Sequence, residues 1–313
     1  MAGEWIDQLV ASMSKRDLTL EDIHEAQKLK QRHFPSALFK YRTVSEYSLK
    51  NLRDSTLFLT TANKFNDPYD SVMDFDPRFG SSVLDGLLSV ADIKDEAIVK
   101  EIRESDEPLV AFGRYVCQQN GEDLTDEKLR EMFAFVSERE GEIHAKSISE
   151  LNVQLRRSYK ICSLSERLDS LPMWAHYAGG HTGFVMEYDF TRLPEKDLIG
   201  LSLWPVVYSG IFDASKILNG YEPGKRFDNM VSVLAALHKA PDWEYEKEWR
   251  LLSLEGLFEI GKCRMPLKAV HLGSKISAED AGKVITNAKI AGVPVFKMRL
   301  VHHEFRMESV PLD

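Results

Sequence analysis

Cysteine is scarce in this sequence, and long apolar runs are missing. Three cysteines are scattered through 313 residues, and no two of them form a CxxC pair. That excludes a zinc knuckle of this spacing and gives no basis for a disulfide framework. No apolar run approaches the ~18 residues of a membrane span, and the N-terminal stretch lacks the apolar core of a signal peptide. These absences predict a soluble cytoplasmic protein without a membrane partner.

Positive charge is also in short supply. The chain has 40 Lys and Arg against 49 Asp and Glu, which gives a formal net charge of -9. It therefore lacks the overall basic charge expected of a nucleic-acid binder. The Walker loop, GxGxxG, HExxH, GxSxG and EF-hand signatures are absent as well. Hydrophobic residues make up 43% of the chain, which is ample for a core.

The order of the expected elements predicts an α+β fold. The sequence predicts a polar, helical N-terminal arm over residues 1–36 and a single α+β domain over residues 37–313. Strand-like composition occurs at 37–42, 56–62, 159–166, 183–190, 204–209 and 248–254, and the C-terminal part reads as strand, helix, strand. Helical spacing dominates from about 81 to 158. The prediction is a mixed, mostly antiparallel sheet core with flanking helices and an all-helical insertion of about four helices.

A turn-rich segment after the second expected strand reads "FNDPYDS", residues 65–71. Asn66 and Asp67 precede a proline and can hydrogen-bond their own backbone, so a stable turn is the simplest explanation. Asp67, Tyr69 and Asp70 also place two carboxylates and a phenol on one tight loop. Loops at strand ends often carry binding residues, so all four are candidate site residues.

The glycine-rich segment "MWAHYAGGHTGF" covers residues 173–184. It predicts a short helix that ends at the glycines and leads into a strand. Trp174 and Tyr177 fit a buried helix face, whereas His176 and His181 lie in a loop-like context. Two histidines without a nearby third ligand do not make a metal site, and no metal is expected. All four residues remain candidates for ligand binding.

Two serines alternate in "CSLSE", residues 162–166. In a strand, Ser163 and Ser165 point to one side and their apolar neighbours to the other. Serine is a poor strand former, so this side faces either solvent or a polar binding site.

The acidic-aromatic segment "WEYEKEWR" covers residues 243–250. If it is extended, the aromatic residues share one face, while Glu246, Glu248 and Arg250 share the other. Glutamates two apart on a strand lie roughly 7 Å from each other and repel unless a cation or a ligand lies near them. A helix would instead pair Glu246 with Arg250, but the β-favouring aromatics indicate a strand, at least from Glu248 onwards.

Five segments taken together, "LFKYR", "TLFLTTANKFNDPYD", "SLS", "MWAHYAGGHTGF" and "WEYEKEWRLL", resemble the bacterial domain-of-unknown-function family 2971. The resemblance covers most of residues 37–305, and the five landmarks occur in the family's order. It implies no established reaction.

A second resemblance is to one class of ADP-ribosyltransferases, which carry an arginine on a first strand, an S-x-S strand and a later Glu-x-Glu pair. Arg42, the pair Ser163 and Ser165, and the pair Glu246 and Glu248 match these in order. The resemblance implies that NAD is a substrate, with Arg42 on its diphosphate and Glu248 on the nicotinamide ribose. The 80 residues between "SLS" and "EKE" are more than is usual for that class, and "LTT" at 59–61 is another candidate for the middle motif.

Three functions stay open at this level. The first is ADP-ribosyl transfer or NAD hydrolysis, with catalytic residues Glu248, Glu246 and Arg42. The second is a metal-dependent hydrolase or nuclease that uses Asp67, His176 and Glu248. The third is a sensor or binding module without catalysis. The sequence leaves open the protein or nucleic-acid acceptor, a toxin or defence role, and the oligomeric state.

Overall fold

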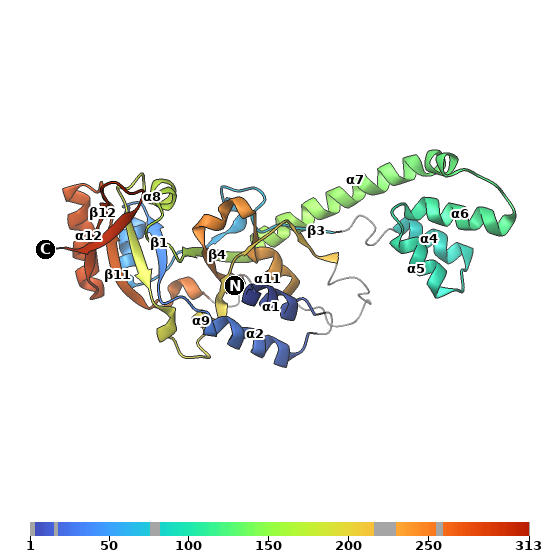
Figure 1. Cartoon of the computed structure of the whole chain (residues 1–313). Coiled ribbons are helices and arrows are strands. Elements are labelled where there is room, and N and C mark those ends of the chain that lie inside the picture. The colour runs from blue at the N-terminus through green and yellow to red at the C-terminus, as the bar shows by residue number, and fades with distance from the viewer. Residues whose placement is uncertain (1–3, 16–17, 76–81, 216–229, 255–258, 313) are drawn as a thin grey trace. The chain divides into compact units, whose positions relative to one another are not determined.

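The computed structural model describes residues 4–15, 18–75, 82–215, 230–254 and 259–312 (Figure 1). The chain divides into two compact units. Unit 1 comprises Met1–Val72, Leu155–Phe212 and Arg226–Asp313, and unit 2 comprises Met73–Gln154 and Asp213–Lys225. The predicted α+β class is confirmed.

Unit 1 is built on one large sheet. In the described part of the chain, nine strands join in the order β13-β12-β11-β5-β1-β4-β10-β6, and β2 pairs with β4 off this path. All of these pairs are antiparallel except β11 with β12. The strands are β1 Leu38–Arg42, β2 Thr60–Thr61, β4 Tyr159–Ser165, β5 Phe184–Tyr188, β6 Leu203–Pro205, β10 Glu248–Leu254, β11 Leu267–Leu272, β12 Val295–Leu300 and β13 Met307–Pro311.

The remaining strands are two residues long. They are β3 Met73–Asp74, β7 Val207–Tyr208, β8 Phe212–Asp213 and β9 His238–Lys239. The helices outside the insertion are α1 Glu4–Met13, α2 Leu20–Arg32, α3 Glu46–Asp54, α8 Leu171–Tyr177, α9 Leu198–Ser202, α11 Met230–Leu237 and α12 Ala278–Ala291. Short 3₁₀ turns are η1 Ala62–Lys64, η2 Phe190–Arg192, η3 Pro241–Glu246 and η4 Ile260–Lys262.

Two of the expected strands are shorter in the structure. The expected strand at 56–62 is reduced to Thr60–Thr61, because Leu57 is buried in the core without entering a ladder. The expected strand at 204–209 ends at Pro205, and Val207–Tyr208 pairs instead with β9. Proline has no N–H for a ladder, so the chain leaves the large sheet there.

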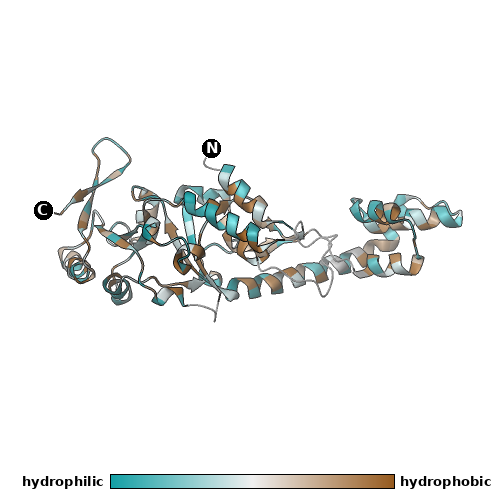
Figure 2. Cartoon of the chain, turned by 90° about the horizontal axis from the view of Figure 1, so that it is seen from below, coloured by the Kyte–Doolittle hydropathy of each residue, from teal (hydrophilic) through white to brown (hydrophobic). Residues whose placement is uncertain are grey.

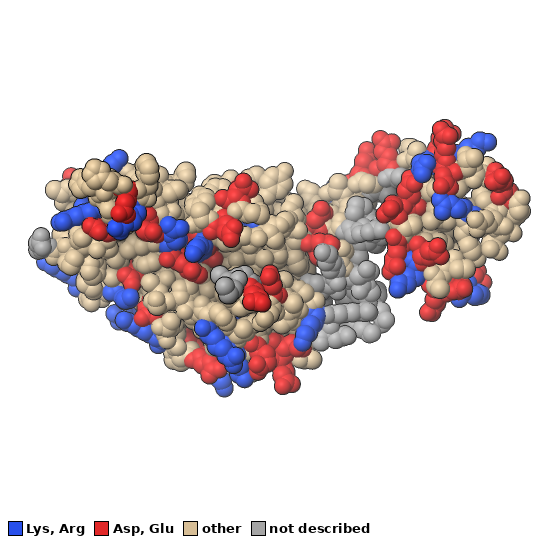
Figure 3. Space-filling model, in the orientation of Figure 1, with Lys and Arg blue, Asp and Glu red and all other residues tan. Residues whose placement is uncertain are grey.

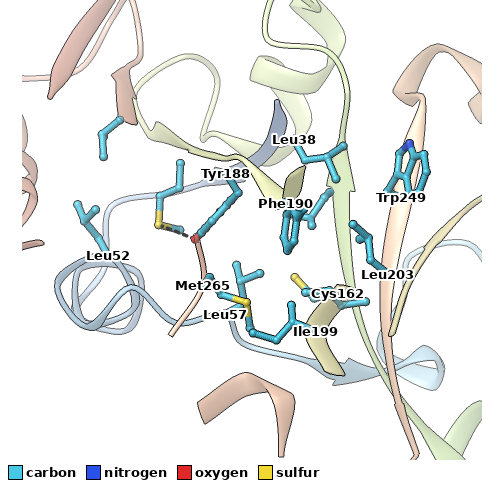
Figure 4. Packing of buried hydrophobic residues seen from close by; sticks show 14 of the residues in the cluster. Leu38, Leu52, Leu57, Cys162, Tyr188, Phe190, Ile199, Leu203, Trp249 and Met265 are labelled. Carbon is cyan, nitrogen blue, oxygen red and sulfur yellow. Dashed lines mark hydrogen bonds between the residues drawn. The ribbon is translucent and has the colours of Figure 1, made fainter. Parts of the chain in front are cut away.

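One face of the sheet carries the main apolar cluster. Leu38 of β1, Leu164 of β4, Phe184 of β5 and Leu251 of β10 all belong to it, together with residues of α3 and α12. Figure 4 shows Leu38 of this cluster beside Phe190, and Leu203 near Trp249. Directly paired residues of antiparallel strands point to the same side, so the register assigns every other side chain of these strands to one of two faces.

The opposite face is partly polar. Its apolar cluster includes Phe39 and Tyr41 of β1, Val185 of β5 and Trp174 of α8. Beside this cluster, the alternation along β10 directs Glu248 and Arg250 to the same face. The ionic network and the His271 cluster described below include side chains on this face, whereas Arg42 points to the other.

The two N-terminal helices belong to unit 1. Thr19 caps α2 with a full capping box. Trp5 and Phe34 pack against the main apolar cluster, and Lys30 is fully buried with its ammonium 3.7 Å from the Trp204 ring centroid. Hydrophobic and hydrophilic residues alternate along these helices (Figure 2), as expected for helices with one face on a core.

Unit 2 contains the four insertion helices, α4 Ser82–Ala91, α5 Glu96–Glu104, α6 Pro108–Asn120 and α7 Asp126–Ser158, the last of which extends into unit 1. Pro108 starts α6, a position where its missing N–H costs no helical hydrogen bond. Leu84, Ile102 and Phe112 form the centre of this unit's own apolar cluster. In the part of the chain that the structure describes, no helix is long and apolar enough to cross a membrane.

Candidate functional site

The segment "WEYEKEWR" is not a continuous strand. Its first four residues lie in η3, Lys247 takes a left-handed conformation with φ 43°, and β10 begins at Glu248. The expected extended backbone is therefore wrong for residues 243–247 and confirmed from Glu248 onwards. The turn at Lys247 joins the two structures, and both Glu246 and Glu248 are buried.

A buried ionic network surrounds these two glutamates. Lys239 Nζ lies 2.5 Å from Glu246 Oε2 and 2.8 Å from Glu248 Oε2. Arg250 Nε lies 2.8 Å from Glu248 Oε1, and Arg250 Nη2 lies 2.7 Å from Asp70 Oδ2. All five side chains are buried, and Arg250 is 0% exposed. Three carboxylates and two cations are thus removed from water together.

Neighbouring groups use the remaining hydrogen-bonding capacity of the network. Arg250 Nη1 donates to Ser71 Oγ at 3.0 Å and to the Ala236 carbonyl at 2.6 Å. The Tyr177 hydroxyl donates to Glu246 Oε1 at 2.8 Å. A buried ion pair is stable only when such additional bonds satisfy its remaining lone pairs and protons. This network meets that condition, which favours a structural role for its charges.

The pKa values follow from the same contacts. Burial alone raises the pKa of Glu248, but the charges of Arg250 and Lys239 outweigh it and hold that pKa far below its usual range. Burial lowers the pKa of Lys239, but Glu248 and Glu246 reverse this and raise it. The glutamate and the lysine are therefore both charged at neutral pH.

The network brings together several segments that the sequence singles out. Asp70 and Asp67 come from the "FNDPYDS" loop, and Asp67 Oδ2 accepts a bond from Trp243 Nε1 at 2.9 Å. Ser165 Oγ, buried in β4, donates to the Glu246 carbonyl at 2.5 Å. Ser165 therefore faces a polar protein interior rather than solvent.

Other candidate residues lie outside the network. Asn66, His176 and Tyr69 are exposed. Trp174 is fully buried, and its Nε1 donates to the Leu168 carbonyl, which agrees with a core role. The carbonyl of Ser163 accepts a bond from Lys40 Nζ at 2.7 Å.

Arg42 and Glu248 do not face the same site. Arg42 pairs with Phe184, whose side chain belongs to the main apolar cluster. Glu248 pairs with Ser165, which in turn pairs with Phe39 on the opposite face. The two side chains therefore point to opposite faces of the sheet, and the expectation that Arg42 and Glu248 share one site is wrong at the level of side-chain direction.

Arg42 instead meets the glycine-rich segment. A Cβ at Gly183 would lie 2.1 Å from the Arg42 carbonyl oxygen, so only glycine fits beside β1 at this point. Gly179, Gly180 and His181 all have positive φ, which is uncommon for histidine. His181 Nδ1 is buried without a partner among the described residues, and burial, with the nearby Lys275 charge, lowers the pKa of His181.

The described residues contain no group of three or more His, Cys, Asp or Glu side chains positioned to hold a metal ion. Of the three residues of the hydrolase hypothesis, His176 is exposed. Asp67 accepts from Trp243, and Glu248 is ion-paired. Their geometry therefore gives this hypothesis no support.

On the face shown in Figure 3, exposed acidic and basic side chains are interspersed.

The fold and the network define an α+β protein in which strand β10, next to last in the order of the large sheet, carries a buried cluster of ion pairs. Residues 173–251 match the model of a family described as protein of unknown function (DUF2971). This part of the chain runs from α8 to Leu251 of β10 and includes both "MWAHYAGGH" and "WEYEKEWR". The comparisons give no support to the ADP-ribosyltransferase resemblance. No curated protein and no solved structure matches the chain.

Sequence reasoning missed Lys239, the cation between the two glutamates. The one available signal is a lysine that ends the apolar run "VSVLAALHKA", residues 231–240. A charged residue in such a run requires a partner, because burial of an unpaired charge is costly.

Removal of Arg250 is expected to destabilise the protein strongly. Arg250→Met leaves Glu248 and Asp70 buried without their cation, which costs about 3–5 kcal/mol. Arg53→Met removes an arginine from an exposed ion pair with Asp54 and is expected to cost less than about 1 kcal/mol. Urea denaturation of both variants measures the difference. Equal losses would contradict a structural role for the network.

The network also predicts acid sensitivity. The folded-state pKa of Glu248 lies below its ordinary value of 4.5. The unfolded state therefore binds a proton first, and the stabilisation present above about pH 4.5 is lost as the pH falls towards the folded pKa. The unfolding free energy of the wild type should fall more steeply below about pH 4.5 than that of Glu248→Gln. Glu195→Gln, at an exposed position, should keep the wild-type slope; equal slopes in all three proteins would refute this interpretation.

Proposed function

We propose that this protein binds a phosphate-bearing nucleotide, with NAD as the first candidate, through Arg42. One observation carries the proposal. Arg42 Nε and Nη2 are buried, and neither has a hydrogen-bond partner among the described residues. A buried donor without a partner is costly, and a guanidinium is more costly still. An anion that accepts from these two nitrogens would remove that cost.

Phosphate suits the geometry of arginine. The planar guanidinium offers donors in a fixed fork, and two parallel bonds to phosphate oxygens use it fully. Arg42 ends β1, so its side chain is held by a strand rather than by a mobile loop. The motif resemblance assigns a diphosphate to this arginine, and the unpaired nitrogens are an independent reason to expect an anion there.

The surroundings of Arg42 support an anionic ligand. β1 pairs with β5 along its whole length but with β4 only through Phe39 and Ser165, so β4 separates from β1 before Arg42 is reached. Lys40 lies in this region, and its Nζ reaches the Ser163 carbonyl. Burial lowers the pKa of Lys40, and the charge of Arg42 lowers it further. A bound phosphate would relieve this repulsion between the two cations.

Loss of Arg42 is expected to weaken nucleotide binding. Hydrogen bonds to a charged group contribute about 1.5–3 kcal/mol, so Arg42→Ala should raise the Kd for NAD and ADP-ribose by about 10- to 100-fold. Arg42→Lys keeps the charge without the fork and should give an intermediate value. Isothermal titration calorimetry measures each Kd, with pyrophosphate as a competitor.

The matched control is Arg53→Ala, because Arg53 is an exposed arginine in an ion pair with Asp54. It should bind like the wild type. Arg42→Ala should also keep the wild-type melting temperature, since its Nε and Nη2 make no hydrogen bond within the described chain. Unchanged affinity in Arg42→Ala, or no binding of NAD to the wild type, would overturn the proposal.

NAD cleavage, as ADP-ribosyl transfer or NAD hydrolysis, is the second candidate. It is favoured by the adjacency of β1, β4 and β10, the three strands that hold the arginine, the S-x-S element and the second glutamate of the Glu-x-Glu pair. Ser165 lies directly opposite Glu248 in the ladder. Because Arg42 and Glu248 face opposite sides, one NAD could contact both only by passing between β1 and β4 where they separate. Glu248 would also have to give up one of its ion pairs, with Lys239 or Arg250, in order to bind the ribose.

Nicotinamide release from NAD distinguishes a cleaving enzyme from a binding module. If the protein cleaves NAD, Glu248→Gln should lower the release rate at least about 100-fold, because the carboxylate stabilises the developing positive charge. Lys239→Gln disturbs the network without touching a residue that the motif resemblance assigns, so it tests whether such disturbance alone has this effect. Melting curves check that both variants fold. Binding without release in the wild type would identify a sensor or binding module instead.

A further inference from the structure

A second polar cluster lies on the partly polar face of the sheet, near the opposite end of the strand order from β10. His271 of β11 is bonded on both ring nitrogens. Its Nε2 lies 2.8 Å from Glu187 Oε2 on β5, and its Nδ1 lies 2.8 Å from Ser309 Oγ on β13. Lys268 Nζ lies 2.6 Å from the other carboxylate oxygen, Glu187 Oε1. The cluster thus forms a hydrogen-bonded chain of serine, histidine and glutamate.

The direction of these bonds follows from the ionisation of Glu187. Burial raises the pKa of Glu187, but hydrogen bonds from His271 and Lys268 outweigh it and lower that pKa below its usual value. An ionised carboxylate only accepts, so a neutral His271 carries its proton on Nε2. Nδ1 then holds a free lone pair, and the Ser309 hydroxyl donates to it. This is the arrangement in which a histidine can remove a proton from serine.

The histidine of this cluster is buried, whereas the serine is exposed. His271 is 4% exposed, and the Phe296 ring stacks on it with ring centroids 5.3 Å apart. Its orientation is therefore fixed by packing as well as by the two bonds. Ser309 is exposed and lies on β13, the terminal strand of the sheet order. A reagent in solution can approach Ser309, while the base behind it stays in place.

We propose that Ser309, His271 and Glu187 form a nucleophilic site for carboxylic esters, separate from the nucleotide site at Arg42. Ser309 Oγ attacks the carbonyl carbon and its proton moves to His271 Nδ1. The bond to the alcohol oxygen then breaks, and the alcohol leaves with that proton. Water hydrolyses the acyl-serine by the same route, which releases the acid and restores Ser309 and His271. Glu187 is a positioning residue that holds the tautomer and stabilises the protonated ring.

The edge of the sheet supplies a candidate donor for the developing oxyanion. β13 pairs with β12 on one side only among the described strands. Alternate N–H groups of such a strand point away from its partner. One of the two N–H groups nearest the nucleophile, that of Ser309 or that of Val310, is therefore directed to the open edge, where it can donate to a negatively charged oxygen.

An alkyl fluorophosphonate tests the site on the intact chain. The probe forms a phosphorus–oxygen bond to an activated serine and releases fluoride, and mass spectrometry locates the adduct. The wild type should be labelled at Ser309, and Ser309→Ala should not be labelled. His271→Gln should react at least about 100-fold more slowly, which is the usual contribution of a general base. Exposed Ser89 and His302 provide matched controls, and Ser89→Ala and His302→Gln should react like the wild type.

The positioning role of Glu187 gives a second test. Glu187→Gln keeps the shape of the side chain but removes the carboxylate that holds the His271 tautomer, so it should slow the labelling of Ser309, and melting curves check that the variant folds. This comparison tests the proposal even if His271→Gln fails to fold. A wild-type labelling rate in Glu187→Gln, labelling at another residue, or no labelling would overturn the proposal.

Discussion

The ion pairs of Arg250 hold the centre of unit 1 together. This arginine projects from β10, binds Glu248 on its own strand and reaches Asp70 on a loop that lies 180 residues earlier in the sequence. Lys239 of β9 also binds Glu248, and it pairs with Glu246 as well. Because each charge is buried, none can lose its partner without a large desolvation penalty. The loop, η3 and the sheet therefore keep one relative arrangement.

That constraint affects how the acidic residues are interpreted. A pair of glutamates near an S-x-S strand suggests catalysis, yet in this protein Glu246 and Glu248 have their cations within the chain. Arg42 is the reverse case, a partly buried arginine with two nitrogens that lack an acceptor. A group whose partners are all internal stabilises the fold, whereas a buried group without a partner indicates a ligand. Arg42 is therefore the stronger functional candidate.

The sheet separates the polar groups into distinct places. The ionic network lies at β10, Arg42 points to the opposite face at the end of β1, and the Ser309–His271–Glu187 chain lies across β13, β11 and β5. A long sheet with apolar clusters on both faces can hold such groups rigidly and independently, because each is fixed by its own strand. Nucleotide binding and ester cleavage can therefore be tested one at a time.

Local chemistry in the sequence was enough to determine the α+β class, the four insertion helices and the strand from Glu248, because hydrophobic periodicity acts over a few residues. It also singled out Asp70, Glu246, Glu248 and Arg250. Only the tertiary structure decided that Arg42 and Glu248 face opposite sides, that Lys239 lies between the glutamates, and that Ser309 meets His271. Strand order and register fix these contacts, and both depend on packing between segments far apart in the chain.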